Sequence, residues 1–351
     1  MTETAANDMG LSRLSGARIA GVVACVPERA VGNDDLIARF GDQVAQVTRM
    51  TGVQSRHIAR QDETTADLCS IAATTLLDRM AVDRASIDVV IFASQTPDHR
   101  LPATACLLQA RLGLGTHVAA FDINLGCSAY PYALWLGTMM IAGGSARRVL
   151  LLVGDTISKI INPDDRATAM LFGDCGTATL LDAEEGAQAT FVLGTDGSGG
   201  RNLIVPTGAF RRDFQRHPAN TNPDDTLFME GGEIFNFTLA IVPSLVDRLV
   251  QGSGLAIEDF DLFLFHQANA FMIKHLAKKA KLALEKVPLN IDRFGNTSSA
   301  TIPLLLATDC RDALTNGRSA MVAMLGFGVG YSWGGCATRV GPLDVAELVT
   351  A

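Results

Sequence analysis

The sequence predicts an α/β fold made of two similar halves. Apolar, β-branched runs typical of buried strands alternate with segments of helical periodicity, and this order indicates a mostly parallel sheet covered by helices. The same order of elements then occurs a second time along the chain. Of the 351 residues, 48% are hydrophobic and 19% are charged, a composition that predicts a globular protein with a large core.

The elements of the first half are predicted from their own patterns and flanking residues. Residues 1–15 are polar and mixed, so we expect an N-terminal extension there. Strands, recognised by short apolar or β-branched runs, are expected over 17–27, 51–59, 87–94, 147–155 and 177–182. Helices, recognised by apolar residues at helical spacing after polar starts, are expected over 33–40, 42–50, 64–80 and 101–111.

The chain contains an internal duplication. The segments ASIDVVIFASQTPD and ARRVLLLVGD of the first half resemble EDFDLFLFHQANA and GRSAMVAMLGFG of the second. Between the paired segments, the turn that carries Cys127 corresponds to the turn that carries Asn296. We therefore expect one half over 16–184 and another over 185–351, joined near 183–186 and related by pseudo-twofold symmetry.

The stretch FDINLGCSAYPYALWLGTMMIA, residues 121–142, is the centre of the first half. A short strand, FDI, runs through Gly126 into an apolar helix, in which Pro131 fits only the first turn. Cys127 is therefore expected at a helix N-terminus, where backbone N–H groups and the helix dipole favour the thiolate. The alternative is that Cys127 is a small buried hydrophobic residue.

A second candidate, His266, lies where the strand DLFLF meets the helix-like QANAFMIKHLAKK. Open α/β sheets bind ligands at the carboxyl ends of their strands, so Cys127, His266 and Asn296 are expected to share one site. A lone histidine is more often structural, and that alternative stays open for His266. The glycine-rich segment GFGVGYSWGG is either a tight turn or a source of backbone N–H donors for an oxyanion.

Composition excludes several functional classes. The net charge of −8 argues against a nucleic-acid-binding protein, which normally presents a basic face. The seven cysteines form no CxxC pair, so neither a metal site nor a disulfide framework is expected. The apolar run IAGVVAC is too short for a signal peptide or a membrane span. We therefore expect a cytoplasmic protein without a membrane span.

Five motifs together resemble those of a known family. They are GCSAYPYAL around Cys127, FGDCGTATLL, HQANAFMI around His266, GNTSSATIP around Asn296, and GFGVGYSWGG near the end of the chain. This set is similar to the β-ketoacyl-acyl-carrier-protein synthase III group of the thiolase superfamily, over essentially residues 16–340. The resemblance implies a five-layered αβαβα thiolase-like fold with mixed, mostly parallel sheets, a homodimer, and these three residues as the catalytic set in a narrow tunnel.

The resemblance also implies a reaction. Cys127 would be acylated by an acyl thioester, with the backbone N–H groups of Cys127 and Gly330 holding the oxyanion. A malonyl thioester on acyl carrier protein would then lose carbon dioxide, and His266 and Asn296 would stabilise the enolate. No cofactor is expected besides these thioester substrates. One alternative is an acyltransferase of the same fold acting on an alcohol or amine, and another is a non-catalytic partner subunit or acyl-binding scaffold.

Further contacts are implied position by position. The acyl and substrate pocket would include Leu101, Phe172, Met229 and Phe271. Arg166 and Gly232 would lie at the pantetheine or coenzyme A arm. The residue types that the family uses to bind this arm are replaced here by Gln46, Met50, Phe271 and Gly232. The acyl donor could therefore be coenzyme A or carrier protein. Lys278 and Lys279 would dock the acidic carrier, or would form an ordinary solvated face.

Overall fold

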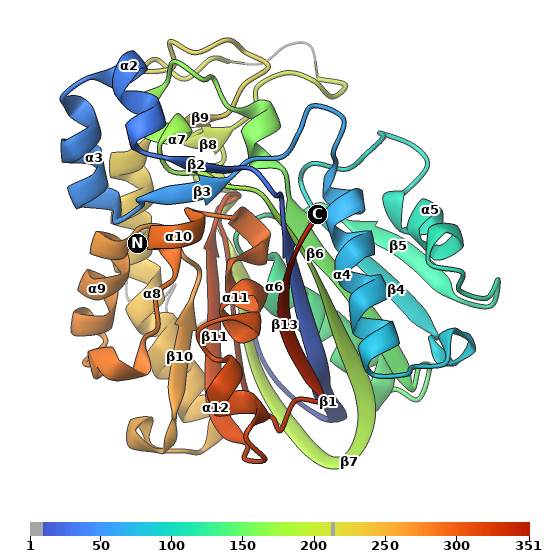
Figure 1. The fold of residues 1–351 in the computed structure, drawn as a ribbon. Helices are drawn as coiled ribbons and strands as arrows, with labels where there is room; N and C mark the ends of the chain where they lie inside the picture. The colour runs from blue at the N-terminus through green and yellow to red at the C-terminus, as the bar shows by residue number, and fades with distance from the viewer. Residues whose placement is uncertain (1–9, 212–214) are drawn as a thin grey trace.

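A large mixed sheet runs through the computed structural model, which describes residues 10–211 and 215–351 (Figure 1). The strands are β1 (Gly10–Val26), β2 (Ala30–Gly32), β3 (Ser55–His57), β4 (Val89–Ala93), β5 (Ala119–Ile123), β6 (Arg148–Asp155), β7 (Cys175–Thr195), β8 (Leu203–Ile204), β9 (Phe228–Met229), β10 (Leu262–Phe265), β11 (Ala320–Gly328), β12 (Ser332–Val340) and β13 (Val345–Thr350). Nine of them form one sheet in the order β10-β11-β12-β7-β6-β4-β5, with β1 beside β7 and β13 beside β1.

The two longest strands, β1 and β7, bend from one layer of the molecule into another. The first part of β7 pairs with β6, and the last part pairs with β12. Figure 1 shows β7 turning at the lower end of the molecule. Its pairing with β1 is interrupted between residues 183 and 188, where the exposed Gly186 has a φ of 84°. The expected join over 183–186 lies in this bend, and both strands continue through it.

The N-terminal extension expected over 1–15 is partly wrong. Residues 1–9 lie outside the described residues, but residues 10–15 are strand, because they pair antiparallel with residues 188–193 of β7. The side chains of this segment are mostly polar and exposed, so their composition resembles that of a loop. Backbone pairing to a segment far along the chain, rather than a local pattern, makes them a strand.

The expectation of a mixed sheet is confirmed, although parallel pairings do not predominate among the described strands. Strand β4 runs parallel to β5 and β6, and β10 runs parallel to β11. Strands β6 and β7, and likewise β11 and β12, pair antiparallel. A short turn joins β11 to β12, and such a connection allows only antiparallel pairing. The repeated segments lie in the series β4-β6-β7 and β10-β11-β12. In each series the first two strands pair parallel and the last two pair antiparallel.

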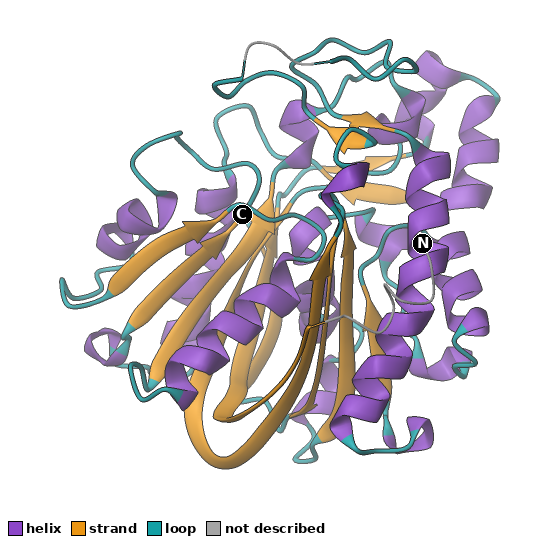
Figure 2. Cartoon of the chain, turned by 180° about the vertical axis from the view of Figure 1, so that it is seen from behind, coloured by secondary structure: helices purple, strands orange, loops and turns teal. Residues whose placement is uncertain are grey.

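Helices cover both faces of this bent sheet and fill the space inside it (Figure 2). The helices are α2 (Ile37–Phe40), α3 (Gln43–Thr51), α4 (Thr65–Arg79), α5 (Thr104–Arg111), α6 (Ala129–Ala142), α7 (Arg166–Ala169), α8 (Gly231–Ser253), α9 (Ala270–Lys279), α10 (Ile291–Phe294), α11 (Thr301–Ala307) and α12 (Arg311–Thr315). Helix α5 starts three residues later than the expected 101, because Leu101 precedes Pro102 and is thereby disfavoured in helical backbone.

Three apolar cores define five layers. Helices α4 and α5 pack on one outer face, against residues such as Leu150 and Leu152 of β6. The alternate residues of β6, such as Leu151, face an inner core with α6 and α11. A third core joins α8 and α9 to the outer face of β10, β11 and β12. The order helices, sheet, helices, sheet, helices is the expected αβαβα arrangement.

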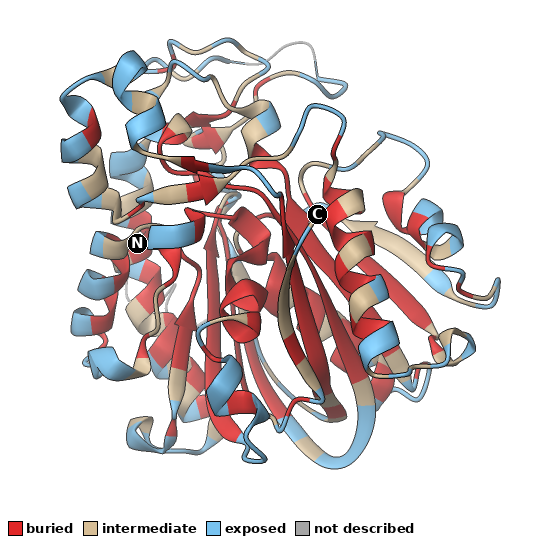
Figure 3. Ribbon diagram, viewed as in Figure 1, coloured by how far each residue is buried: buried red, intermediate tan, exposed pale blue. Residues whose placement is uncertain are grey.

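Helix α6 lies at the centre because its sequence is apolar on every side. AYPYALWLGTMMIA contains no charged residue, and a helix of that kind is stable in water only when it is buried. Figure 3 shows the inner helices and strands largely buried, whereas the outer helices alternate between buried and exposed residues. Gly137 lets α6 approach β7, since a Cβ there would lie 2.7 Å from Leu181. Across 10–211 and 215–351, no helix combines the length and apolar character needed to span a bilayer.

Candidate active site

Cys127 lies on the turn between β5 and α6, two residues before the helix begins. The glycine-rich end of β11 packs against this turn. A Cβ at Gly326 would lie 2.8 Å from the Cys127 carbonyl oxygen, and one at Gly328 would lie 2.8 Å from the Cys127 sulfur. Both distances are too short for any side chain, so the sequence GFG is required for β11 to support the cysteine.

The thiol of Cys127 is not held as a thiolate by the helix end, contrary to the expectation. Burial raises the pKa of Cys127 to about 11, although backbone N–H groups of Val329 and of Cys127 itself act in the opposite direction. These two N–H groups converge on the sulfur. Gly330, the residue predicted as the second oxyanion donor, follows Val329 and lines the adjoining cavity, and its donor role stays a prediction.

His266 follows the last residue of β10, and its side chain is only 2% exposed. Its Nδ1 lies 2.8 Å from the Thr301 hydroxyl, and the edge of the Phe327 ring packs against the imidazole with ring centroids 5.7 Å apart. Burial lowers the pKa of His266 to about 3, while the nearby Ser298 carbonyl acts the other way. The imidazole is therefore neutral at physiological pH.

Asn296 is fixed by its backbone and by its side-chain oxygen. Its N–H donates to the Leu171 carbonyl at 2.9 Å, and its own carbonyl accepts from the Gly173 N–H at 3.1 Å. The side-chain Oδ1 accepts from the backbone N–H of Ser298 at 2.9 Å. Because Oδ1 is occupied in this way, the NH₂ end of the amide is the part that a ligand would meet.

Two cavities meet at Cys127. The smaller, of about 90 Å³, is lined by Cys127, His266 and Asn296 together, so the structure brings the three predicted residues to one place. The larger, of about 540 Å³, also reaches Cys127. Its walls are mainly apolar, formed by residues such as Ile157, Ile160, Phe172, Leu203, Ile204, Val205 and Leu227. The nucleophile thus has a small polar space on one side and a large apolar one on the other.

The predicted pocket residues lie in different places. Phe172 lines both cavities and Met229 lines the smaller one. Leu101 is 79% exposed and lines neither cavity. Phe271 is 60% exposed and stacks on Phe235, with ring centroids 6.2 Å apart. Within one chain, Leu101 and Phe271 therefore lie on the surface, and the expectation that Leu101 reaches the acyl tunnel of a second subunit stays a prediction.

The predicted pantetheine and carrier contacts lie on the surface. Arg166 is exposed, and it donates a hydrogen bond of 2.6 Å to Gln43. Gly232 is exposed at the start of α8, next to Gly231, which lines the smaller cavity. Lys278 and Lys279 are exposed at the end of α9. The Lys279 ammonium donates to the Leu239 carbonyl of α8 at 2.7 Å.

Three residues at the site were not predicted. The Ser298 hydroxyl bonds to the Cys127 thiol, and Val329 supplies an N–H to the same sulfur. Asp155, at the end of β6, is completely buried behind the turn that carries Ser298. Only Asp155 had a usable signal, since it is a polar residue at the carboxyl end of a buried strand, as is His266.

Comparisons with known proteins agree with this geometry. The family model described as 3-oxoacyl-(acyl-carrier-protein) synthase III matches residues 121–197, and the model for the C terminal of the same enzyme matches residues 250–340. The β-ketoacyl-(acyl-carrier-protein) synthase III of Caldanaerobacter subterraneus subsp. tengcongensis is 35% identical over 319 residues, which cover 90% of this chain and 96% of that protein.

Solved structures show the same relationship. The 3-oxoacyl-(acyl-carrier protein) synthase of Burkholderia xenovorans LB400 is 50% identical with a TM-score of 0.95, and the match covers 98% of this chain and 100% of that one. The β-ketoacyl-(acyl carrier protein) synthase III of Thermus thermophilus is 36% identical with a TM-score of 0.83, covering 92% and 99%. The chain therefore belongs to the β-ketoacyl-acyl-carrier-protein synthase III family, and it is a condensing acyltransferase with a thiolase-like fold.

Proposed function

We propose that Cys127 carries the acyl group and that His266 and Asn296 stabilise the enolate formed when a malonyl thioester loses carbon dioxide. The observation that supports this proposal is the shared 90 Å³ cavity, which is lined by the Cys127 thiol together with His266 and Asn296, and also by the neutral Thr238 and Asn269. No other residue type that could abstract a proton from carbon lines that cavity within the described residues. A decarboxylating condensation needs no such base, because the departing carbon dioxide leaves its electron pair on the α-carbon.

In the first half-reaction, the Cys127 sulfur attacks the carbonyl carbon of an acyl thioester and gives up its proton. The negative charge that develops on the carbonyl oxygen is held by the N–H groups of Cys127 and Val329, which already converge on the sulfur. The tetrahedral intermediate collapses, the carbon–sulfur bond to the donor breaks, and the departing thiolate takes up a proton. An acyl-cysteine and a free thiol result.

In the second half-reaction, the thioester carbonyl of a malonyl group accepts hydrogen bonds from the Asn296 amide and the His266 imidazole. The carboxylate leaves as carbon dioxide, and its bonding electrons form an enolate whose oxygen is stabilised by the same two donors. The enolate carbon attacks the acyl-cysteine carbonyl. The bond from that carbonyl to sulfur then breaks, which releases a β-ketoacyl thioester and a Cys127 thiolate. The thiolate takes up a proton from solvent, and the Cys127 thiol is restored.

The donor role of His266 requires the ring proton on Nε2. The Thr301 hydroxyl lies 2.8 Å from Nδ1 and 3.2 Å from the Ser298 carbonyl, so Nδ1 is its nearer acceptor. When Thr301 donates to Nδ1, the neutral imidazole carries its proton on Nε2 and presents a donor to the substrate. The imidazole then stabilises negative charge without itself being protonated.

The two cavities suggest where each substrate lies. We place the reacting part of the malonyl group in the smaller cavity, beside His266 and Asn296, and the tail of the acyl group in the 540 Å³ cavity with its apolar walls. Cavities that hold a drug-sized ligand are typically about 300–1,000 Å³. The donor is therefore proposed to include acyl chains longer than acetyl.

The carrier protein and the oligomeric state are further parts of the proposal. Lys278 has an exposed position in the last turn of α9, the helix whose first turn lines the smaller cavity, and a cation there suits an acidic carrier. Lys278→Glu together with Lys279→Glu should lower the efficiency of turnover with malonyl carrier protein, and unchanged turnover would place docking elsewhere. We also propose a homodimer, in which the exposed Leu101 contacts the second subunit, and sedimentation equilibrium tests this directly.

Intact-protein mass spectrometry tests the proposed function. The protein is incubated with coenzyme A and carrier-protein thioesters of increasing chain length, and Cys127→Ser serves as the control for the acylated atom. The proposal predicts that the wild type gains the mass of one acyl group. The variant, which has no thiol at this position, should form no stable thioester there. A protein that is acylated but gives no malonyl-dependent carbon dioxide would be an acyltransferase instead.

A further inference from the structure

A buried carboxylate lies directly behind the proposed site. Asp155, the last residue of β6, is completely buried, and every group it contacts is a hydrogen-bond donor. Its Oδ1 accepts from the Gln95 N–H at 2.7 Å and the Ser94 hydroxyl at 3.1 Å. Its Oδ2 accepts from the N–H and the hydroxyl of Ser299, at 3.2 and 2.7 Å. Burial raises the pKa of the Asp155 carboxyl, and the hydrogen bonds from Ser299 and Gln95 act in the opposite direction, because both oxygens act only as acceptors.

The partners of Asp155 come from two segments that lie far apart along the chain. Ser94 and Gln95 directly follow β4, whereas Ser299 lies in the 3-10 turn Ser298–Ala300, about two hundred residues later. Ser298 in that turn has a φ of 51°, a backbone conformation that residues other than glycine rarely adopt. Such a conformation persists only when surrounding contacts hold it, and the two bonds from Ser299 to Asp155 are contacts of that kind.

The same turn contacts all three residues assigned to the reaction. The Ser298 N–H donates to Oδ1 of Asn296 at 2.9 Å, and the Ser298 hydroxyl bonds to the Cys127 thiol. Thr301, the residue that follows the turn, has its hydroxyl 2.8 Å from Nδ1 of His266. A shift of this turn would therefore change the direction of the Asn296 amide and the His266 ring together.

We infer that Asp155 is a positioning residue for the condensation step: its carboxylate ties the Ser298–Ala300 turn to the loop after β4, and thereby sets the donor directions of Asn296 and His266. This inference rests on the proposed roles of those two residues. Asp155 itself touches no substrate, since it lines neither cavity at Cys127.

Asp155→Asn is the most direct perturbation. An asparagine has one acceptor oxygen and one NH₂ donor, so in either orientation its NH₂ would face an N–H group, that of Gln95 or that of Ser299. The turn must then move away from the side chain. The substitution also removes a negative charge that raises the pKa of the Cys127 thiol. The other titratable side chain described in the smaller cavity is His266, and it contributes no charge because it is neutral.

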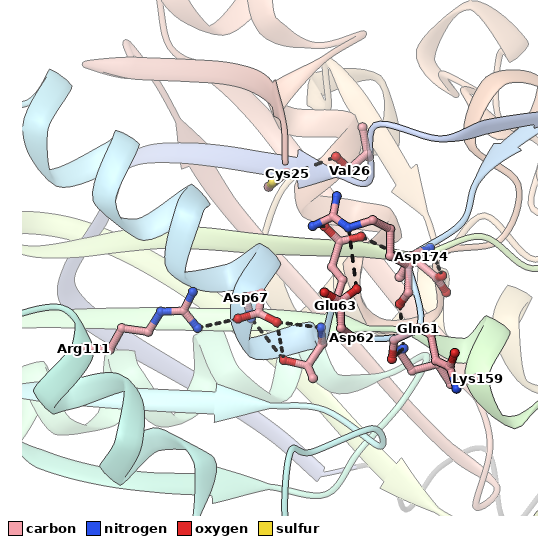
Figure 4. A network of polar contacts seen from close by, with 12 residues as sticks. Cys25, Val26, Gln61, Asp62, Glu63, Asp67, Arg111, Lys159 and Asp174 are labelled. Carbon is pink, nitrogen blue, oxygen red and sulfur yellow. Dashed lines mark hydrogen bonds and ion pairs between the residues drawn. The ribbon is translucent and has the colours of Figure 1, made fainter.

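Asp174 provides a matched control. It is also completely buried, and its carboxylate also accepts several hydrogen bonds, from the Ala59 N–H at 2.8 Å and from the N–H and hydroxyl of Ser158. These bonds tie together other loops, seen near Lys159 in Figure 4, and none of them involves the Ser298–Ala300 turn. Asp174→Asn therefore removes a comparable buried carboxylate whose own hydrogen bonds reach neither the Asn296 nor the His266 side chain. Its neighbour Gly173 bonds to the backbone carbonyl of Asn296, so this control differs from Asp155→Asn in acting on the backbone of Asn296 and not on the direction of its amide. Ser299→Ala, which removes one of the bonds to Asp155 and keeps its charge, is a milder second variant.

The experiment compares acylation of Cys127, followed by intact mass, with carbon dioxide release from carboxyl-labelled malonyl carrier protein by the pre-acylated enzyme. For Asp155→Asn we expect release to fall about 100-fold, as for a displacement of about 1 Å at a reacting group, and acylation to fall less than about 10-fold. Ser299→Ala should lie between this variant and the wild type. Asp174→Asn should lower the melting temperature but keep the wild-type ratio of release to acylation.

A second readout is the pH dependence of Cys127 alkylation by iodoacetamide. Its midpoint should move to lower pH in Asp155→Asn, whereas Ser299→Ala, which keeps the charge, should retain the wild-type midpoint. The inference is overturned if Ser299→Ala and every folded Asp155 variant keep the wild-type ratio of carbon dioxide release to acylation. It is also overturned if Asp174→Asn lowers this ratio as much as Asp155→Asn does. Failure of the proposed function would appear differently, as undiminished carbon dioxide release by His266→Ala and Asn296→Ala.

Discussion

The neutral state of His266 leads to a prediction about stability and pH. The folded protein holds the His266 pKa at about 3 against an ordinary value of 6.5. Below pH 6.5 the unfolded chain binds a proton at this imidazole, and the folded protein does not bind one until the pH nears 3. The folded state therefore loses stability as the pH falls below 6.5, and the contribution is present in full above that value.

The magnitude follows from the two pKa values. One pKa unit corresponds to about 1.4 kcal/mol, so the interval from pH 6.5 to pH 5 gives about 2 kcal/mol of lost stability from His266. Urea unfolding of the wild type and of His266→Gln at pH 7 and pH 5, at one protein concentration, isolates this effect because the other titrating groups are common to both proteins. The wild type should lose about 2 kcal/mol more than the variant between these pH values. Equal losses would show that the imidazole is not held neutral by burial.

Three further predictions concern the sulfur and the larger cavity. Alkylation of Cys127 should accelerate with pH up to about 11, since burial raises its pKa to that value, and a plateau between pH 7 and 8 would contradict this. Gly328→Ala, whose Cβ would lie 2.8 Å from the sulfur, should destabilise the protein by about 1–3 kcal/mol and slow acylation about 100-fold. Gly197→Ala, whose Cβ would meet nothing within 4 Å, should change neither quantity. Calorimetry measures the stability, and intact mass measures the rate of acylation. Ile160→Trp, which narrows the larger cavity, should reduce acylation by dodecanoyl thioesters at least about 10-fold relative to acetyl thioesters, and an equal effect on both would place the acyl tail elsewhere.

Local patterns were sufficient to predict the elements that carry the site. Helix α4 begins with a capping box of Thr64 and Asp67, and it starts one residue after the predicted boundary. Cys127 and His266 could be identified because each stands at the junction of a strand and a helix, where the periodicity of the sequence changes. The duplication supplied the relation between the turns of Cys127 and Asn296, which lie far apart along the chain.

What the sequence did not reveal depends on contacts between distant segments. Residues 10–15 become a strand only because β7 offers them a pairing edge. The N–H group of Val329 acts on the Cys127 sulfur, and this contact depends on how the end of β11 packs against Cys127. The raised pKa of Cys127 and the role of Asp155 follow from burial, which a local pattern near a helix N-terminus cannot show.

The central claim is that one thiol and two neutral donors divide the reaction between them. Carbon dioxide release from carboxyl-labelled malonyl carrier protein, measured on pre-acylated wild type, His266→Ala and Asn296→Ala, tests it most directly. The account predicts that both variants are acylated on Cys127 to completion and that each releases carbon dioxide at least about 100-fold more slowly than the wild type. Loss of acylation in both variants, or release at the wild-type rate, would contradict it.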